Sequence, residues 1–321
     1  AGTLLIGASR FGLPISTTHS IVGAIVGFGA VAIGIDAVNW PKVLQISLSW
    51  ITSPLLAGVI AFAIFHLIRS TILNKSNPVH QIRKYGPAFF FFVFFIIGLI
   101  TLFKGLKHIN LDLDLMEALA GSVGLGLIGS GIGAFFIRRV QIGEADPDHR
   151  FNQVERIFVV LQILTACAIA FAHGSNDVAN AIGPLAAIVN AVENIDLTAK
   201  APVAPWMLAI GGLGIVIGLA TWGYRVMETV GKKITELTPS RGFAAQLAAA
   251  STIVLASRLG IPISTTHTLV GAVLGVGLAR GITALDLRVV GNILASWIAT
   301  LPIAAALSVF FYYFFKGLLT A

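Results

Sequence analysis

The sequence is poor in cysteine, with Cys167 alone, and poor in charge, with 11% charged residues among 321. One thiol excludes a disulfide framework and a thiolate metal site within a single chain. A hydrophobic content of 56% excludes an ordinary soluble domain. Acidic residues number 14 against 21 lysines and arginines, but the basic residues are scattered over short loops. That scatter reflects orientation in a membrane rather than binding to nucleic acid, and we expect no nucleic-acid partner.

Long apolar runs are abundant instead. Several are long enough to cross a hydrocarbon core of roughly 30 Å, which takes ~20 residues, and they lack the alternation of barrel strands. We therefore expect an all-α polytopic protein of the plasma or inner membrane, surrounded by lipid, with a homodimer left open. The runs are residues 44–67, 87–103, 115–137, 207–224 and 290–315.

One polar segment inside this apolar sequence occurs twice. Residues 10–27 and 258–275 are identical at 12 of 18 positions, and both contain Pro-Ile-Ser-Thr-Thr-His. Each copy leads through a Gly-rich stretch and a short loop into a long span with tryptophan and proline at matching places, in residues 49–54 and 296–302. Internal duplication is a common plan of secondary transporters.

The distribution of lysine and arginine indicates that the two copies are inverted. If each repeated segment is a re-entrant hairpin, alternating crossings put 14 basic residues on the side where the span ending near Arg69 leaves the membrane, and five on the other. By the positive-inside rule the richer side is cytoplasmic, so the C-terminus is extracytoplasmic. The five are Lys42, Lys104, Lys107, Lys200 and Lys316.

The predicted fold is therefore a set of inverted-topology repeats with two re-entrant helical hairpins and a broken helix. The first repeat covers residues 1–70, N-terminally incomplete, with a hairpin at 10–34 and a span at 41–70. Residues 71–156 form connecting spans and cytoplasmic loops. The second repeat covers residues 157–321, with the broken helix at 157–192, a hairpin at 242–280 and a span at 289–316.

The repeated segments have the chemistry of helix starts at membrane depth. Pro14 and Pro262 disfavour helix in the residue before them, and the Ser-Thr-Thr triplets that follow suit an N-cap. The helix N-terminus after each proline would offer free N–H groups, hydroxyls and a positive dipole end to an anion. Hydrogen bonding between helices is the alternative for these hydroxyl groups, and the duplication beside proline argues against it.

The flanking histidines and arginines are harder to assign. His19 and His267 could contact a ligand, shuttle a proton or bind a neighbouring carbonyl, and we favour the structural role. The side chains of Arg10 and Arg258 could lie in a cavity or extend to the membrane–water interface, and the sequence does not distinguish these two positions.

Asp177 is the one acidic residue of the 14 that lies inside an apolar stretch rather than in or beside a loop. An intramembrane carboxylate indicates a functional site. A continuous helix over residues 157–192 would be ~54 Å long, so we expect a break at residues 173–176. Asp177 and Asn180 would then share a face and offer oxygen ligands to Na⁺ or a proton-linked equivalent. The alternative is that Asp177 caps its own helix.

These motifs together resemble the inorganic phosphate transporter family, the PiT-type Na⁺- or H⁺-coupled phosphate symporters. The resemblance rests on Gly-Ser-Asn-Asp-Val-Ala-Asn-Ala at residues 174–181 and on Pro-Ile-Ser-Thr-Thr-His at residues 14–19 and 262–267, and it covers nearly the whole chain. The family pattern has an Asn-Asp-x-x-Asn segment in each repeat, whereas this chain has one. Its Gly-Ala-Asn-Asp also reads Gly-Ser-Asn-Asp here.

The resemblance implies import of inorganic phosphate coupled to Na⁺ or H⁺, with no resident cofactor and no enzyme activity. It implies phosphate ligands at Ser16, Thr17, Thr18, Ser264, Thr265, Thr266, Asn176 and Asn180. It implies cation ligands at Asp177, Asn180, Asn176, Thr266 and Thr18, with His19, His267 and Ser175 as accessory residues.

Other functions remain open from the residues alone. A transporter or channel for another oxyanion such as sulfate, or a receptor, would use the same chemistry. An intramembrane hydrolase could use serine, histidine and aspartate, although two Ser-Thr-Thr-His copies with one aspartate are odd for one triad. Repeat spacing also predicts a second Asn-Asp-x-x-Asn element ~70 residues before residue 1, packed against Thr17 and Thr18, with one side of the anion site open without it.

Overall fold

The computed structural model describes residues 1–102, 113–139, 147–194, 203–259, 261 and 263–320. Within them it has helices and no strands, and six helical segments are long and apolar enough to cross a membrane. The prediction of an all-α polytopic membrane protein is therefore confirmed. The six are Trp40–Leu73, Pro78–Ile100, Leu115–Arg139, Gln153–Val192, Pro205–Lys233 and Leu287–Thr320.

The described residues form eleven α-helices. They are α1 (Gly2–Arg10), α2 (Thr17–Ala32), α3 (Trp40–Ile68), α4 (Pro78–Ile100), α5 (Leu115–Arg139), α6 (Pro147–Asn194), α7 (Pro205–Gly218), α8 (Tyr224–Glu228), α9 (Pro239–Arg258), α10 (Thr265–Arg280) and α11 (Leu287–Thr320). Short 3-10 turns precede α3 and α11, at Ile35–Ala37 and Ile282–Ala284. π-helical turns extend α3 (Arg69–Leu73), join α7 to α8 (Leu219–Gly223) and follow α8 (Thr229–Lys233).

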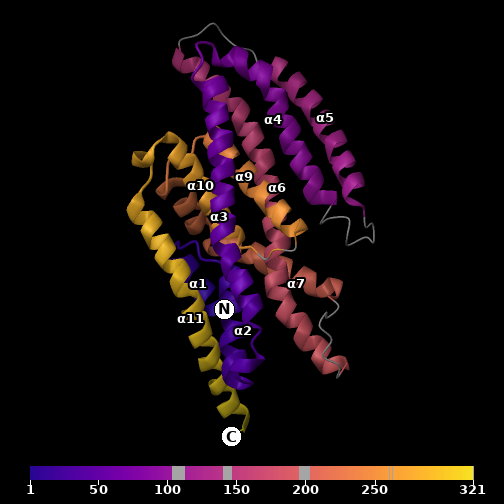
Figure 1. The fold of residues 1–321 in the computed structure, drawn as a ribbon, viewed down its shortest axis with the longest axis vertical. Helices are drawn as coiled ribbons and strands as arrows, with labels where there is room; N and C mark the ends of the chain where they lie inside the picture. The colour runs from indigo at the N-terminus through magenta and orange to yellow at the C-terminus, as the bar shows by residue number, and fades with distance from the viewer. Residues whose placement is uncertain (103–112, 140–146, 195–202, 260, 262, 321) are drawn as a thin grey trace.

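Two helical hairpins, α1–α2 and α9–α10, carry the repeated segments at their turns. Each α-helix after the turn packs on the long helix of the other copy, α2 on α11 and α10 on α3. In Figure 1, α2 and α11 lie side by side in the lower half of the view and α3 and α10 in the upper half. The long helices α3 and α11 run in opposite directions, as the expected inversion requires. The repeat boundaries themselves stay a prediction, and Pro262, Lys104, Lys107 and Lys200 lie outside the described residues.

The predicted break at residues 173–176 of the helix over 157–192 is wrong, because α6 is helical without interruption from Pro147 to Asn194. Its 48 residues correspond to about 72 Å, far more than a bilayer is thick. The apolar span begins only at Gln153, so the polar start of the helix need not lie in lipid, and tilting takes up more of the length. A single glycine such as Gly174 costs only ~1 kcal/mol in a helix, too little to break one that neighbouring helices support.

The core lies where α9 and α10 enter the bundle formed by α3, α4 and α6. The rings of Phe89, Phe158 and Phe243 pack together with centroids 5.7–6.1 Å apart. Most residues of α9 are buried, including an alanine-rich stretch. A re-entrant helix ends inside the membrane and leaves backbone groups unpaired there, so it has to be covered by protein in this way.

Glycines let the hairpin helices approach the long helices closely. Gly23 and Gly27 of α2 face the backbone of α11, where an added Cβ would lie 2.7 Å from the Leu301 carbonyl oxygen and 2.6 Å from the Ala305 Cα, respectively. Gly271 and Gly275 of α10 meet the backbone of α3 in the same way. Small residues four apart are the usual means of close helix contact in membranes. The contact holds both hairpin turns at fixed positions in the bundle.

Candidate functional site

One face of α6 contacts the turns of both hairpins. The Thr265 hydroxyl donates to the Asp177 carboxylate at 3.3 Å, and the Asn180 amide donates to the hydroxyls of Thr17 at 3.5 Å and Thr18 at 3.1 Å. Asp177 and Asn180 are three residues apart and therefore neighbours on the helix surface. Asp177, Asn180 and Thr17 are half-buried, and Thr18 and Thr265 are buried. The arrangement brings a carboxylate, an amide and hydroxyls from two helix N-termini into one cluster, which we call the central site.

Serine caps the helix behind each turn. The Ser16 hydroxyl accepts from the backbone N–H of His19, and the Ser264 hydroxyl accepts from that of His267, both at 3.2 Å. Both serines are 1% exposed. An N-cap satisfies one of the free N–H groups of the first turn and leaves the others without an intrahelical acceptor. Of the predicted phosphate ligands, the two serines therefore cap the helix starts, and Thr17, Thr18 and Thr265 contact Asn180 or Asp177 at the site.

The two histidines lie in a stack of four rings between the hairpins. His19 lies 3.5 Å from the Trp50 ring and His267 lies 3.5 Å from the Trp297 ring, while the histidine rings are 4.2 Å apart. The indole N–H of Trp297 donates to the Pro14 carbonyl at 2.9 Å, so α11 holds the turn of the first hairpin. Nδ1 of His267 lies 3.4 Å from the Trp50 carbonyl. Both histidine rings are packed against protein at this point and hold the turns together.

His173 is a member of the site that the sequence patterns did not indicate. Its Nε2 lies 3.0 Å from the Asp177 carboxylate, and Asp177 is only 14% exposed. The four-residue spacing is the signal that would have found it, since such pairs meet on a continuous helix. The pair was not predicted, because the expected break at residues 173–176 would have placed the two side chains on separate helices.

The remaining predicted residues lie around this cluster. The Asn176 amide is 3.4 Å from the Asp177 carboxylate, whereas the exposed Ser175 donates to the Ala172 carbonyl within its own helix. Thr266 is half-buried next to Thr265. Arg10 and Arg258 are both exposed. A Cβ on Gly174 would meet no atom within 4 Å, so α6 faces open space beside the site.

The hairpins do not assemble a hydrolytic triad. Neither ring nitrogen of His19 has a hydrogen-bond partner among the described residues. The Ser16 hydroxyl contacts the backbone N–H of His19, from which it accepts, and not the His19 ring. A serine nucleophile needs contact with its base, and no such contact is made here.

Two helical hairpins whose turns meet one face of a long apolar helix, with polar side chains at both helix N-termini, are typical of a polytopic membrane transporter. Comparison with known proteins narrows the class, because the model of the phosphate transporter family matches residues 1–308. This chain belongs to that family, whose members are transporters and not enzymes.

Similar proteins cover almost the whole chain. One from Haemophilus influenzae, named "Putative phosphate permease", is 46% identical over 314 residues, which are 98% of this chain and 75% of the relative. A second relative, from Thermococcus kodakarensis and also named a putative phosphate permease, is 47% identical over 309 residues, which are 96% of this chain and 74% of the relative. A solved structure entitled "The sodium-dependent phosphate transporter" aligns with a TM-score of 0.86 and 40% identity, covering 97% of this chain and 76% of that one.

Proposed function

We propose that this protein is a symporter that carries inorganic phosphate into the cell together with Na⁺, and that the central site binds both. The observation that carries the proposal is the contact of one α6 face with both hairpin turns, through Asp177 to Thr265 and through Asn180 to Thr18. Sodium is favoured over a proton because the similar solved structure is described as sodium-dependent.

Phosphate would bind at the N-termini of α2 and α10. The first-turn N–H groups that Ser16 and Ser264 leave free point along the helix axes with the positive ends of the helix dipoles. Thr17, Thr18 and Thr266, with the Asn180 amide, supply side-chain donors. A phosphate dianion cannot enter a low-dielectric region unless donors and positive charge replace its water.

The cation would bind at the Asp177 side of the cluster. Its carboxylate, with the amide oxygens of Asn176 and Asn180 and the hydroxyls of Thr18 and Thr266, makes a set of hard oxygen ligands. The bound Na⁺ would neutralise part of the phosphate charge across the same cluster. Each ligand then binds better in the presence of the other, which is the thermodynamic requirement for coupled transport.

Uptake of labelled phosphate into proteoliposomes tests this function. An inward Na⁺ gradient should drive accumulation above the external concentration, and a sodium ionophore should collapse it. Choline in place of Na⁺ should leave only background uptake. Equal accumulation in choline with an inward proton gradient would move the coupling to H⁺, and uptake that never exceeds equilibrium would indicate a channel.

Sulfate is the competing oxyanion. At neutral pH phosphate retains a proton that can donate to an acceptor such as the Asp177 carboxylate or a threonine oxygen, and sulfate has none. Leaving that acceptor unpaired costs ~1–3 kcal/mol, so we expect at least about tenfold preference for phosphate. Unlabelled sulfate that competes as well as unlabelled phosphate would contradict this assignment.

A further inference from the structure

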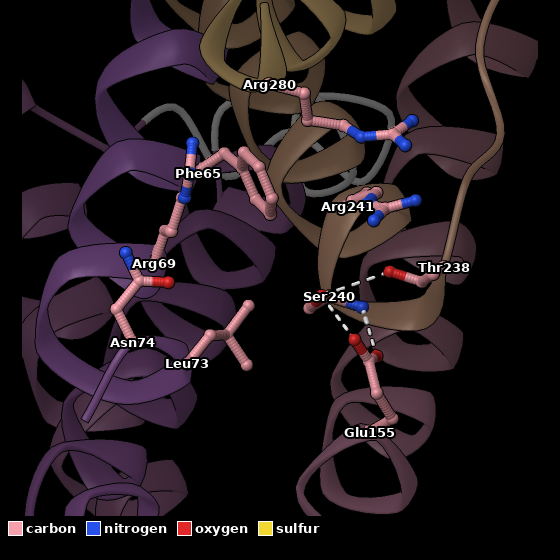
Figure 2. A pocket seen from close by; sticks show the side chains of 9 residues that line it. All are labelled: Phe65, Arg69, Leu73, Asn74, Glu155, Thr238, Ser240, Arg241 and Arg280. Atoms are coloured by element: carbon pink, nitrogen blue, oxygen red, sulfur yellow. Dashed lines mark hydrogen bonds between the residues drawn. The ribbon is translucent and has the colours of Figure 1, made fainter. Parts of the chain in front are cut away.

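A cavity distant from the central site gathers three arginines. Three arginines line a cavity of about 270 Å³. Arg69 directly follows α3, Arg280 ends α10, and Arg241 lies in the first turn of α9. Figure 2 shows Arg69 on one wall and Arg241 with Arg280 on the other. Glu155 is the one acidic residue in the described lining, so the lining side chains carry two net positive charges. We call this cavity the arginine pocket.

The arginine pocket is separate from the central site. Along α10, Arg280 is 15 residues from Thr265, or about 22 Å. Along α6, Glu155 is 22 residues from Asp177, or about 33 Å. The pocket lies at the end of α3 that the loop charges assign to the cytoplasm.

Contacts with carbonyl and hydroxyl oxygens hold the three guanidinium groups without neutralising them. Arg69 donates to the Ala279 carbonyl at 3.1 Å, Arg241 to the Glu236 carbonyl at 3.0 Å, and Arg280 to the Thr235 hydroxyl at 3.0 Å. Each guanidinium has five N–H donors, so most remain available. The Glu236 carboxylate is 4.0 Å from Arg241 but 84% exposed, and water screens a pair of that kind.

Glu155, the acidic residue of the described lining, already has hydrogen-bond partners at one end of the cavity. Both Glu155 oxygens are engaged by Ser240, one accepting from its backbone N–H at 2.8 Å and the other from its hydroxyl at 2.7 Å. The pKa of the Arg241 guanidinium is lowered from its ordinary value, first by burial and next by the charge of Arg280. The two guanidinium groups therefore repel each other, and an anion between them would relieve that repulsion.

We propose that the arginine pocket is a second anion site, which binds a phosphate group on the predicted cytoplasmic side of the protein. Guanidinium groups bind phosphate oxygens in pairs of parallel hydrogen bonds, and two net positive charges match a phosphate dianion. A water molecule takes about 30 Å³ of liquid volume, so the cavity holds a phosphate group with several waters. The phosphate group belongs either to released inorganic phosphate or to the headgroup of a phosphate-monoester lipid.

Binding of labelled inorganic phosphate to the purified full chain, in neutral detergent with choline in place of Na⁺, tests the first source. Asp177→Asn serves as the background, because it removes Na⁺-dependent binding at the central site. In the Asp177→Asn protein, saturable phosphate binding at the arginine pocket should persist. Adding Arg241→Gln/Arg280→Gln to that protein should weaken it at least about tenfold. Arg288→Gln is the matched control, since Arg288 is exposed, lies on the same predicted side and does not line the pocket.

Two further variants keep the test decisive if the double substitution impairs folding. Arg241→Lys/Arg280→Lys retains both charges and should bind more weakly than the native pair, because lysine cannot bind bidentately. Glu155→Gln keeps an acceptor for Ser240 and removes the negative charge, so phosphate should bind about three times more tightly. A purely structural Glu155 would leave phosphate affinity unchanged.

Nanodiscs of phosphatidylcholine with and without phosphatidic acid test the second source. Phosphatidic acid that stays bound through purification, competes with labelled phosphate and is lost in Arg241→Gln/Arg280→Gln would identify a lipid headgroup. Binding of phosphate alone would identify the free anion. Absence of both, or equal binding in the double variant and in Arg288→Gln, would overturn the proposal. Loss of Na⁺-driven uptake with intact pocket binding would refute the transport function alone.

Discussion

The two hairpins are nearly the same in sequence and meet different partners on α6. Both have a serine N-cap at 3.2 Å from the following backbone N–H and a histidine 3.5 Å from a tryptophan ring. The second hairpin, however, contacts the Asp177 carboxylate through Thr265, and the first contacts the Asn180 amide through Thr18. The local sequence therefore determines the shape of each turn, while the α6 residue that the turn contacts determines which ligand the turn can help to bind.

This difference gives the two hairpin turns different roles in ligand binding at the proposed site. Both helix starts can take part in phosphate binding, but only the second turn also contacts the Asp177 carboxylate, through Thr265, and is therefore the one closer to the proposed cation. The first turn contacts the Asn180 amide, which is a donor to an anion. Four predictions test how the two hairpins are held and what each turn binds, in order of decreasing expected effect.

Asp177→Asn should have the largest effect, because it removes the negative charge at the centre of the site while keeping the side-chain shape. Disrupting a charge held in such a site typically costs about 3 kcal/mol or more, or about a hundredfold in rate. Na⁺-driven phosphate uptake in proteoliposomes is the measurement, with the exposed Asp36→Asn as control. Near-native uptake by Asp177→Asn would show that Asp177 does not bind the coupling ion.

Gly27→Ala and Gly275→Ala should both destabilise the fold, because each new methyl group would clash with the backbone of a long helix. Overpacking of this kind costs about 1–3 kcal/mol. Gly29→Ala, in the same helix as Gly27, is the control, since its Cβ would meet only a Val38 methyl at 3.8 Å. Thermal unfolding of the purified variants measures the effect. Equal stability of Gly27→Ala and Gly29→Ala would mean that α2 does not pack on α11 as described.

Thr265→Val and Thr18→Val should separate the two hairpins. Each removes a hydroxyl and keeps the shape, with an expected loss of about tenfold in apparent affinity. Thr265→Val should raise the Na⁺ concentration for half-maximal uptake, and Thr18→Val should raise the phosphate concentration. Thr266→Val should also weaken transport, by analogy with Thr18. If Thr265→Val and Thr18→Val change the same constant equally, the division between the hairpins is wrong.

Trp297→Phe should have the smallest effect. It removes the N–H that donates to the Pro14 carbonyl and keeps a ring against His267, at a cost of about 1 kcal/mol. Faster hydrogen exchange in the turn of the first hairpin, measured by mass spectrometry, would report the loss. Trp50→Phe tests the symmetry, because Trp50 packs on His19 at 3.5 Å as Trp297 packs on His267. Unaltered exchange in both variants would show that the ring stack does not hold the turns.

Much of the fold follows from the sequence because its signals are local. Proline, the Ser-Thr-Thr triplets and the duplicated segments mark both turns, and apolar length marks the spans. The contact of Asp177 with a hairpin hydroxyl also follows, since an isolated intramembrane carboxylate has few alternatives to a shared polar cluster. The contact of Asn180 with Thr17 and Thr18 was not predicted, because the repeat spacing assigned another segment to that turn.

The continuity of α6 could not be read from the sequence. Gly174 and Ser175 lower helix propensity, but packing of the whole helix outweighs a cost of ~1 kcal/mol. The pairing of His173 with Asp177 depends on that continuity and was hidden with it. The ring stack joins residues that are far apart in the chain, such as His267 and Trp50, and no local pattern reports such a contact.

The arginine pocket could not be predicted from the sequence for a related reason. Arg69, Arg241 and Arg280 count in the sequence only as loop charges that set orientation. Their convergence comes from the packing of α10 against α3 and α9, which brings three helix ends together.

Anomalous diffraction from crystals grown with arsenate and Na⁺ would test the central claim most directly, because arsenate has the shape and charge of phosphate and its arsenic can be located. We expect an arsenic peak between the two hairpin turns, within hydrogen-bond distance of Thr18 and Asn180, that disappears when choline replaces Na⁺. A crystal saturated with arsenate whose peaks all lie away from both turns would contradict it.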